Sequence, residues 1–331
     1  MKIWDESVAW PVRRQQLVRI MCEQEYGFGP LAPDSLEAST LMEDTKYCAG
    51  KAALRRISLK SVWNCKDFSF PVDIIVPGRE SQVPFFVYIS FEDKTPNSYL
   101  PVEEIVDNGF GILTFGYNGV TTDDADMDNG IAGLFPGCGK LAYWAWAASR
   151  VMDYAQRIPQ FDMTRSALAG HSRLGKAALL AGALDERFAY VISNESGCSG
   201  AAISRGKQGE TIADIYSRFP YWFIPEYGRY AGNENAAPFD QHFLLGSIAP
   251  RKLYVASAQG DAWADPAAEY RGCLSASESY EKLGLNGFVH DSETPSVGCV
   301  LHEGDIGYHL RRGTHYLSRE DWGLFMRFIG S

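Results

Sequence analysis

The chain has 331 residues, of which 46% are hydrophobic and 22% are charged, and its formal net charge is −10 at pH 7. This length can bury a large core and fits one large α/β domain or two modest ones. The acidic balance argues against nucleic acid or an anionic membrane as the main partner, and the sequence has no run of 18 apolar residues that could span a membrane.

The cysteine pattern and the first residues leave the compartment open. The seven cysteines are scattered and odd in number, so we expect no disulfide framework, and the sequence leaves one or two single bridges open. Residues 1–6 contain no apolar stretch of the kind found in a secretory signal peptide. A cytoplasmic chain and a secreted chain from which a signal has been removed both fit these observations, and the oligomeric state has no signature in the sequence.

Elements in the first half of the chain are predicted from hydrophobic periodicity. Helical patterning covers residues 12–25 and is followed by prolines and mixed polar sequence, so residues 1–60 are predicted to be an N-terminal extension packed on the main domain. Apolar or alternating runs rich in β-branched residues predict strands at residues 68–76, 84–91 and 110–117. An acidic loop at residues 118–130 then leads to a strong helix at residues 140–156.

The second half of the chain alternates strands with helices. Strands are predicted at residues 165–170, 188–193 and 252–258, and helices at residues 177–184, 270–283 and 319–329. Such alternation is typical of an α/β fold with a mostly parallel central sheet flanked by helices on both faces, a three-layer sandwich. No repeat or break in composition divides the chain, so we expect residues 1–331 to form a single catalytic domain. Residues 206–238, rich in aromatic residues and turns, are expected to line the site or cover it as a lid.

The most informative segment is Gly170-His171-Ser172-Arg173-Leu174-Gly175-Lys176. It joins a short apolar run to a segment rich in alanine and leucine, which predicts a strand, a sharp turn and a helix. An α/β-hydrolase places its nucleophilic serine at such a turn, where the helix N-terminus offers backbone N–H groups to an oxyanion. Ser172 is therefore a candidate nucleophile, although the spacing is G-x-S-x-x-G instead of the common G-x-S-x-G. Lys176 lies one turn later on the same face of the helix and, taken alone, is predicted to be a solvated residue.

A serine nucleophile needs a histidine base, which in α/β-hydrolases follows the last strands in the chain order serine, acid, histidine. Three histidines near the C-terminus are candidates: His302, His309 and His315. We favour His315, because it lies in a loop with glycine just before the terminal helix, whereas His309 is expected in a strand. The remaining histidines are expected to be structural: His171, His242 and His290.

Two acids compete for the third position. Glu195 follows the strand after the nucleophile helix, and Asp261 follows the strand at residues 252–258; the carboxyl end of a strand suits either residue. Glu195 could instead cap a helix, and Asp265 before Pro266 has the pattern of a helix N-cap. Position in the chain leaves the assignment open between Glu195 and Asp261.

Acidic and histidine side chains also gather between His302 and His315, but their spacings match no common zinc motif. We therefore expect chemistry without a catalytic metal. No other cofactor is expected for a serine-based reaction.

Several ordered segments together resemble the glucuronoyl esterases, carbohydrate esterase family 15. The segment around Ser172 is similar to the serine motif of that family, and Asn194-Glu195-Ser196-Gly197 is similar to its acid-bearing segment. Further similar elements are G-E-T at 209–211, F-P-x-W-F at 219–223, D-Q-H at 240–242, I-A-P-R at 248–251, D-x-W-A-D-P at 261–266, and the closing stretches at 307–309, 313–315 and 321–322. The resemblance is dense from about residue 160 to 325 and weaker before that.

The resemblance implies an α/β-hydrolase fold and a serine esterase without a metal. The implied substrates are esters of glucuronic or 4-O-methylglucuronic acid, such as those that join xylan side chains to lignin alcohols in lignocellulose. Ser172 is the implied nucleophile, His315 the implied base and Arg173 an implied oxyanion-hole residue. The implied sugar contacts are Lys176, Glu210 and Trp263. Members of the family carry the acid at the position of Glu195 or at that of Asp261, and of the two we favour Glu195.

Two other classes of protein share parts of this pattern. An acetyl xylan esterase or another carbohydrate esterase would use the same catalytic machinery. A non-catalytic carbohydrate-binding relative of the α/β-hydrolases would bind sugar and tolerate the loss of Ser172. A peptidase or a dienelactone-type hydrolase fits less well, because of the segments around Glu210 and Trp263. The expected partner is therefore a carbohydrate ester such as glucuronoxylan, and neither nucleic acid nor a membrane.

Overall fold

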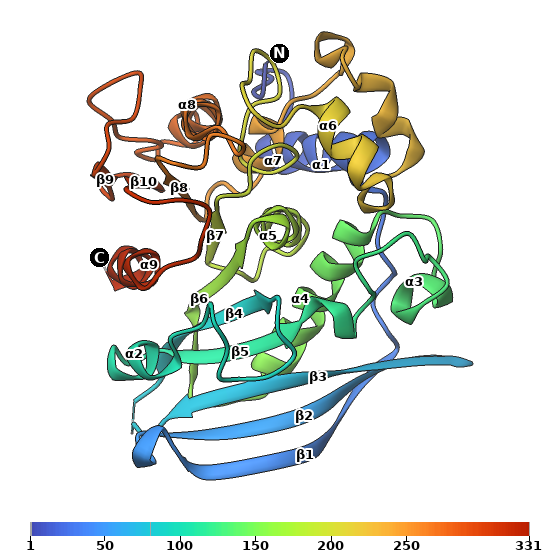
Figure 1. Ribbon diagram of the computed structural model, residues 1–331, viewed down its shortest axis with the longest axis vertical. Coiled ribbons are helices and arrows are strands. Elements are labelled where there is room, and N and C mark those ends of the chain that lie inside the picture. Colours follow the sequence, from blue (N-terminus) through green and yellow to red (C-terminus); the bar gives the residue numbers. More distant parts are fainter. Residues whose placement is uncertain (1, 80, 331) are drawn as a thin grey trace.

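The computed structural model describes residues 2–79 and 81–330, and these residues form one ten-stranded sheet (Figure 1). The strands are β1 (Ser35–Tyr47), β2 (Ala52–Trp63), β3 (Lys66–Pro77), β4 (Val83–Ser90), β5 (Gly111–Gly116), β6 (Phe161–His171), β7 (Tyr190–Asn194), β8 (Lys252–Ala258), β9 (Val300–Leu301) and β10 (Ile306–Arg311). Their order is β1-β2-β3-β5-β4-β6-β7-β8-β10-β9. The strands from β5 to β10 in this order are parallel, and antiparallel strands flank them on both sides.

Helices cover both faces of the sheet. They are α1 (Trp10–Met21), α2 (Val102–Asp107), α3 (Gly130–Leu134), α4 (Lys140–Ala155), α5 (Arg173–Leu184), α6 (Ile212–Arg218), α7 (His242–Gly246), α8 (Pro266–Glu281) and α9 (Arg319–Gly330). Successive strand residues face opposite sides: Phe85 and Val87 join the buried cluster of α4 and α5, whereas Phe86 and Tyr88 join that of α2 and α9. The predicted three-layer arrangement is therefore confirmed.

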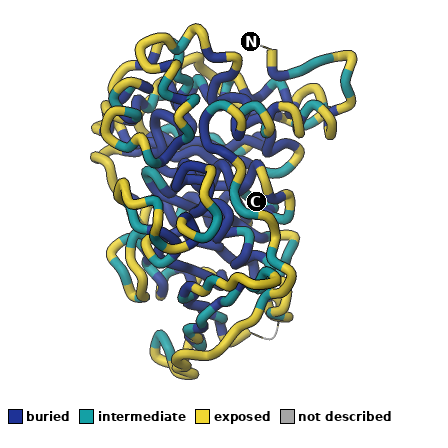
Figure 2. Tube along the Cα trace, turned by 90° about the vertical axis from the view of Figure 1, so that its right-hand side faces the viewer, coloured by how far each residue is buried: buried dark blue, intermediate teal, exposed yellow. Residues whose placement is uncertain are grey.

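The region predicted as an N-terminal extension, residues 1–60, contributes strands to the sheet that the sequence does not predict. These strands are β1 and β2, and β2 pairs with β3 from Ala52 opposite Pro77 to Trp63 opposite Lys66. Almost every residue of β1 is exposed, so the strand has no alternation of apolar and polar residues for a pattern to detect. Figure 2 shows the buried residues in the middle of the molecule and exposed chain at the end where β1 lies.

Most other predicted elements are confirmed with small shifts at their ends. The strand predicted at residues 252–258 coincides with β8, the helix predicted at 140–156 ends one residue earlier as α4, and His309 lies in β10. Residues 206–238 form α6 and several 3₁₀ turns. Across the described part of the chain, none of the helices is both long enough and apolar enough to span a bilayer.

Candidate active site

A cavity of about 350 Å³ brings together all eight site residues singled out in the sequence. They are Ser172, Arg173, Lys176, Glu195, Glu210, Asp261, Trp263 and His315. The residues that complete the lining are Ser196, Gly197, Arg218, Phe219, Trp222 and Ala264. Ser172, Glu195 and Asp261 each follow the carboxyl end of a parallel strand, namely β6, β7 and β8. The cavity therefore lies where an open α/β sheet usually binds its ligand.

The turn that carries Ser172 is strained and depends on glycine. Ser172 has φ 57° and ψ −127°, a conformation that residues with a side chain rarely adopt. A Cβ on Gly170 would lie 2.1 Å from the carbonyl oxygen of Leu174, so only glycine fits there. A Cβ on Gly175 would lie 3.1 Å from Ser193 Oγ, which shows that the displaced glycine lets α5 pack closely on the end of β7. The unusual motif spacing is thus a packing feature of this turn.

A backbone N–H donor and one cation, both of Arg173, lie at the N-terminus of α5. The backbone N–H of Arg173 belongs to the first turn of the helix, where N–H groups have no carbonyl partner four residues earlier. The Arg173 guanidinium donates to the carboxylate of Asp123 and lies 5.0 Å from the ring centroid of Trp222 and 5.6 Å from that of Phe219. A backbone donor and a fixed cation thus lie directly after Ser172, as an oxyanion would require.

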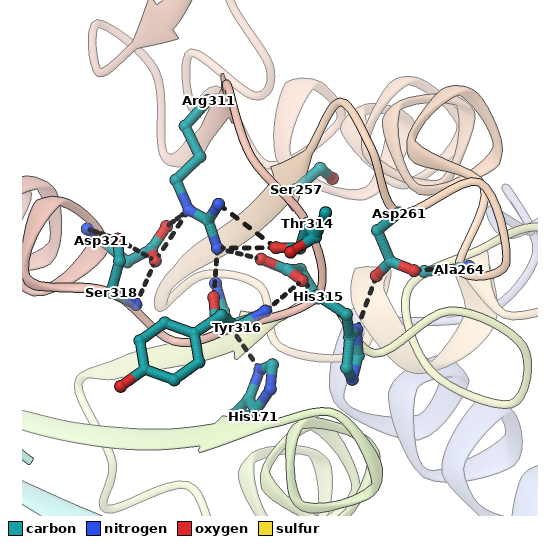
Figure 3. A network of polar contacts seen from close by, with 12 residues as sticks. His171, Ser257, Asp261, Ala264, Arg311, Thr314, His315, Tyr316, Ser318 and Asp321 are labelled. Atoms are coloured by element: carbon teal, nitrogen blue, oxygen red, sulfur yellow. Dashed lines mark hydrogen bonds and ion pairs between the residues drawn. The ribbon is translucent and has the colours of Figure 1, made fainter. Parts of the chain in front are cut away.

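His315 contacts both candidate acids. Its Nδ1 lies 2.7 Å from Asp261 Oδ2 and 3.3 Å from Glu195 Oε2. Figure 3 shows His315 on the side of Asp261, which also accepts the backbone N–H of Ala264 at 3.3 Å. The sequence favours Glu195 as the acid, whereas the shorter contact with His315 belongs to Asp261.

Glu195 has a second set of partners that hold the loop of His315. Its carboxylate accepts Arg311 Nη2 at 2.6 Å and the backbone N–H of Tyr316, the residue after His315, at 3.0 Å. Arg311 also donates to Asp321 at 2.9 Å, and Figure 3 shows its guanidinium between Asp321 and the loop that carries Tyr316. Glu195 is 1% exposed. The ion pair with Arg311 therefore ties the end of β7 to the end of β10, and the bond from the Tyr316 N–H ties it to the loop that follows.

The titration properties of these groups differ. Burial lowers the pKa of His315, but the hydrogen bonds and charges of Asp261 and Glu195 outweigh it and raise this pKa to about 9. Burial raises the pKa of Glu195 to about 7. Burial also acts to raise the pKa of Asp261, but its contact with His315 prevails and lowers that pKa. Asp261 is therefore the carboxylate whose charge is best coupled to a protonated His315.

A second wall of the cavity combines charge with an exposed aromatic ring. Lys176 is buried, and its Nζ donates to the carbonyl oxygens of Ser196 at 2.5 Å and of Cys198. It also lies 3.8 Å from Glu210, which accepts the indole N–H of Trp263 at 3.1 Å. The prediction of a solvated Lys176, made from the residue alone, is wrong. Trp263 is 43% exposed, and the guanidinium carbon of Arg218 lies 4.9 Å from its ring centroid. This wall therefore combines charged groups with a partly exposed aromatic ring.

The other candidate histidines lie outside this cavity. His309 is buried in β10, where its ring bonds to Asp321 at 2.8 Å and to Tyr254 at 3.0 Å. His302 bonds to the same tyrosine hydroxyl at 2.8 Å. Of the three candidates, His315 alone lines the cavity with Ser172.

Sequence reasoning missed Arg218, Phe219 and Trp222, which line the cavity, and Asp123, which lies behind the lining as the partner of Arg173. Two of them lie in the F-P-x-W-F element that the family resemblance had already marked. Aromatic residues more often belong to a core, and nothing local in the sequence shows that these face a cavity.

Among the described residues, one group of side chains could hold a metal ion, and it consists of the two acids and the histidine of the cavity. The ligand atoms of Glu195, Asp261 and His315 lie within 4.8 Å of one another. The same atoms hydrogen-bond to one another and to Arg311. A cation placed among them would face the guanidinium of Arg311 and the protonated form of His315, so the arrangement suits proton transfer better than metal binding.

The fold and this cavity define the class of α/β-hydrolases, with a serine at a strained strand-to-helix turn and a histidine beside carboxylates. A family model described as glucuronyl esterase, fungi, matches residues 60–284, and the chain belongs to this family.

Individual relatives agree with this assignment. The chain is 37% identical to the prokaryotic carbohydrate esterase MZ0003 over 237 residues, which are 69% of this chain and 54% of the relative. It is 35% identical to 4-O-methyl-glucuronoyl methylesterase 1 of Sodiomyces alcalophilus, over 60% of this chain and 43% of the relative. A solved glucuronoyl esterase from Solibacter usitatus superposes with a TM-score of 0.89 at 33% identity, covering 99% of this chain and 94% of that chain. The chain spans about half the length of the first two relatives.

Proposed function

We propose that this chain is a serine esterase that hydrolyses esters of glucuronic or 4-O-methylglucuronic acid through an acyl-enzyme. The observation that carries the proposal is a single cavity that is lined by Ser172 and His315 together with charged groups and a partly exposed indole. The name of the Sodiomyces relative, a 4-O-methyl-glucuronoyl methylesterase, supports the same substrate class. By the same argument the expected substrates are carbohydrate esters of the kind found in glucuronoxylan and in lignin–carbohydrate linkages.

The first half of the reaction forms the acyl-enzyme. Ser172 Oγ attacks the ester carbonyl while its proton passes to Nε2 of His315, because Nδ1 of that ring already bonds to Asp261. The negative charge that develops on the carbonyl oxygen is stabilised by the backbone N–H and guanidinium of Arg173. The bond between the carbonyl carbon and the alcohol oxygen then breaks, and His315 returns the proton to the departing alcohol.

The second half releases the uronic acid. Water attacks the acyl carbon, His315 takes its proton, and the bond to Ser172 breaks as the serine regains that proton. Lys176, Glu210 and Trp263 hold the sugar in both halves, so that its carboxyl carbon stays at the nucleophile.

The two acids divide their work in this proposal. Asp261 orients the imidazole and stabilises its protonated form, since it has the shorter contact and the lower pKa. Glu195 fixes the loop of His315 through Arg311 and supports the imidazole from 3.3 Å.

Hydrolysis of benzyl glucuronate by the wild type and by Ser172→Ala tests the proposal. The wild type should release benzyl alcohol, and the variant should lose at least about 10⁴-fold in kcat with an unchanged melting temperature. Turnover that survives in Ser172→Ala would exclude Ser172 as the nucleophile. Faster deacetylation of acetylated xylan than hydrolysis of the glucuronate ester would favour an acetyl xylan esterase, and binding of glucuronoxylan without hydrolysis would favour a non-catalytic relative.

A further inference from the structure

The guanidinium of Arg173 is held by a residue outside the cavity lining, Asp123, in the loop after β5. We infer that Asp123 is the positioning residue for Arg173, and that it sets the orientation of the cation that faces the oxyanion. This inference rests on the role proposed above for Arg173. Asp123 has no other assignment in the reaction.

Asp123, Arg173 and Trp222 form a closed group of three contacts. One carboxylate oxygen, Oδ2, accepts the Nη1–H of Arg173, and the other, Oδ1, accepts the indole N–H of Trp222 at 2.6 Å. The guanidinium also lies over the ring of that same tryptophan, with 5.0 Å between its carbon and the ring centroid. Asp123 thereby fixes both the direction of the arginine fork and the plane on which it stacks.

The surroundings of Asp123 keep it in place. Its side chain is 9% exposed, and its backbone N–H donates to Asn118 Oδ1 at 3.2 Å. The hydroxyl of Tyr221 donates to its backbone carbonyl at 3.3 Å. A carboxylate this enclosed is a stiff anchor, whereas an arginine on a surface would sample many rotamers.

The rest of the acidic loop is organised by an internal cation. The side chain of Lys140, at the start of α4, is fully buried, and its Nζ donates to the carbonyl oxygens of Thr122 at 2.5 Å and Asp126 at 2.7 Å. The same ammonium lies 3.3 Å from Asp124 Oδ1. The charge of Asp124, next to Asp123, is thus balanced from within the protein. The carboxylate of Asp123 pairs with Arg173 and also accepts the indole N–H of Trp222 and, at 3.4 Å, the hydroxyl of Tyr117.

Kinetics of Asp123→Asn, Arg173→Ala and the double variant test the inference on benzyl glucuronate. Asparagine keeps the size of the side chain but weakens the contact with the guanidinium. We expect Asp123→Asn to lower kcat by about 10- to 100-fold with a KM within about 3-fold of the wild type, below the about 10²- to 10³-fold loss of removing an oxyanion donor itself. In the Arg173→Ala background the same change should have no further effect, because the group that Asp123 orients is gone.

Controls separate positioning from folding. Asp128→Asn removes a charge from an exposed residue of the same loop and should leave kcat and melting temperature unchanged. The inference would be overturned if the losses of kcat in Asp123→Asn and Arg173→Ala multiply in the double variant. It would also be overturned if the loss of kcat in Asp123→Asn follows a loss of melting temperature.

The test stays decisive if the proposed substrate is wrong. A wild type that hydrolyses p-nitrophenyl acetate but not benzyl glucuronate refutes the uronate specificity alone, and the coupling is then measured on the acetate. A wild type inactive on both refutes the esterase proposal, and a crystal structure of Asp123→Asn then decides. The guanidinium of Arg173 should leave the face of Trp222 in that structure, and an unmoved guanidinium would overturn the inference.

Discussion

Replacing each carboxylate beside His315 by its amide separates a catalytic acid from an anchoring one. Asp261→Asn removes the charge that lies 2.7 Å from Nδ1 of the imidazole, and Glu195→Gln removes the charge that lies 3.3 Å from it. Both changes keep the size of the side chain. The structure predicts that the first change lowers activity and the second lowers stability.

The activity loss for Asp261→Asn follows from the geometry. An amide at this position can donate to Nδ1 and favour the wrong tautomer, and in a triad with one acid this exchange costs about 10⁴-fold in kcat. Glu195 remains in reach of the same nitrogen, so we expect a smaller loss of about 10²-fold, which is about 2.7 kcal/mol of transition-state stabilisation. The melting temperature should stay within about 2 °C of the wild type, since a single exchange that leaves the buried packing intact costs little.

The stability loss for Glu195→Gln follows from the buried ion pair, and it applies above about pH 7, where the carboxylate of Glu195 is charged. Removing one partner of a buried pair costs about 3–5 kcal/mol when the other charge is left alone. Arg311 keeps its bonds to Asp321 at 2.9 Å, so we expect a loss below that range, about 2–3 kcal/mol. The kcat should fall by less than about 10-fold at temperatures where the variant is folded, because Asp261 still orients the imidazole.

Benzyl glucuronate hydrolysis and thermal denaturation measure the two effects on the same preparations. Each amide variant serves as the matched control of the other. A larger loss of kcat in Glu195→Gln than in Asp261→Asn, at equal fractions folded, would refute the reasoning and make Glu195 the acid of the triad.

Three further predictions concern the base, the turn and the sugar wall. The kcat/KM of the wild type should rise with pH up to the pKa of His315 at about 9, because only the neutral imidazole accepts the serine proton. Asp261→Asn removes a negative charge that favours the protonated imidazole. The midpoint of the rise in a pH–rate profile should therefore move to lower pH in this variant. Gly170→Ala should lower the free energy of unfolding by about 1–3 kcal/mol, because its Cβ would meet a backbone oxygen at 2.1 Å, and chemical denaturation should show a clearly smaller loss for Gly175→Ala. Trp263→Ala should raise KM for benzyl glucuronate by about 10-fold, the equivalent of about 1.4 kcal/mol of binding, and leave KM for p-nitrophenyl acetate unchanged; equal effects on both esters would contradict a sugar contact.

The sequence predicted the helices and strands well where the pattern of apolar residues matches the side chains that are buried. Strands such as β8 and the long helix α4 have continuous or one-sided apolar sequence, so their positions can be read without neighbours. The exposed strand β1 has no such signal, because it is held by backbone pairing with β2 instead of by burial of its side chains.

The sequence by itself determined the strained turn of Ser172, since glycine, serine and helix-forming residues act within a few positions of one another. Motif order, together with the family resemblance, also led to eight of the fourteen residues that line the cavity. Tertiary structure alone decided which carboxylate lies closer to His315, because Asp261 is 54 positions away in the chain and the distance depends on how the loops after β8 and β10 meet. It also decided that Lys176 is buried and that Asp123 holds Arg173. Contacts of this kind join segments that are far apart in the chain, and no local sequence pattern encodes the distance between them. The site residues could therefore be named from the sequence, whereas the role of each residue could not.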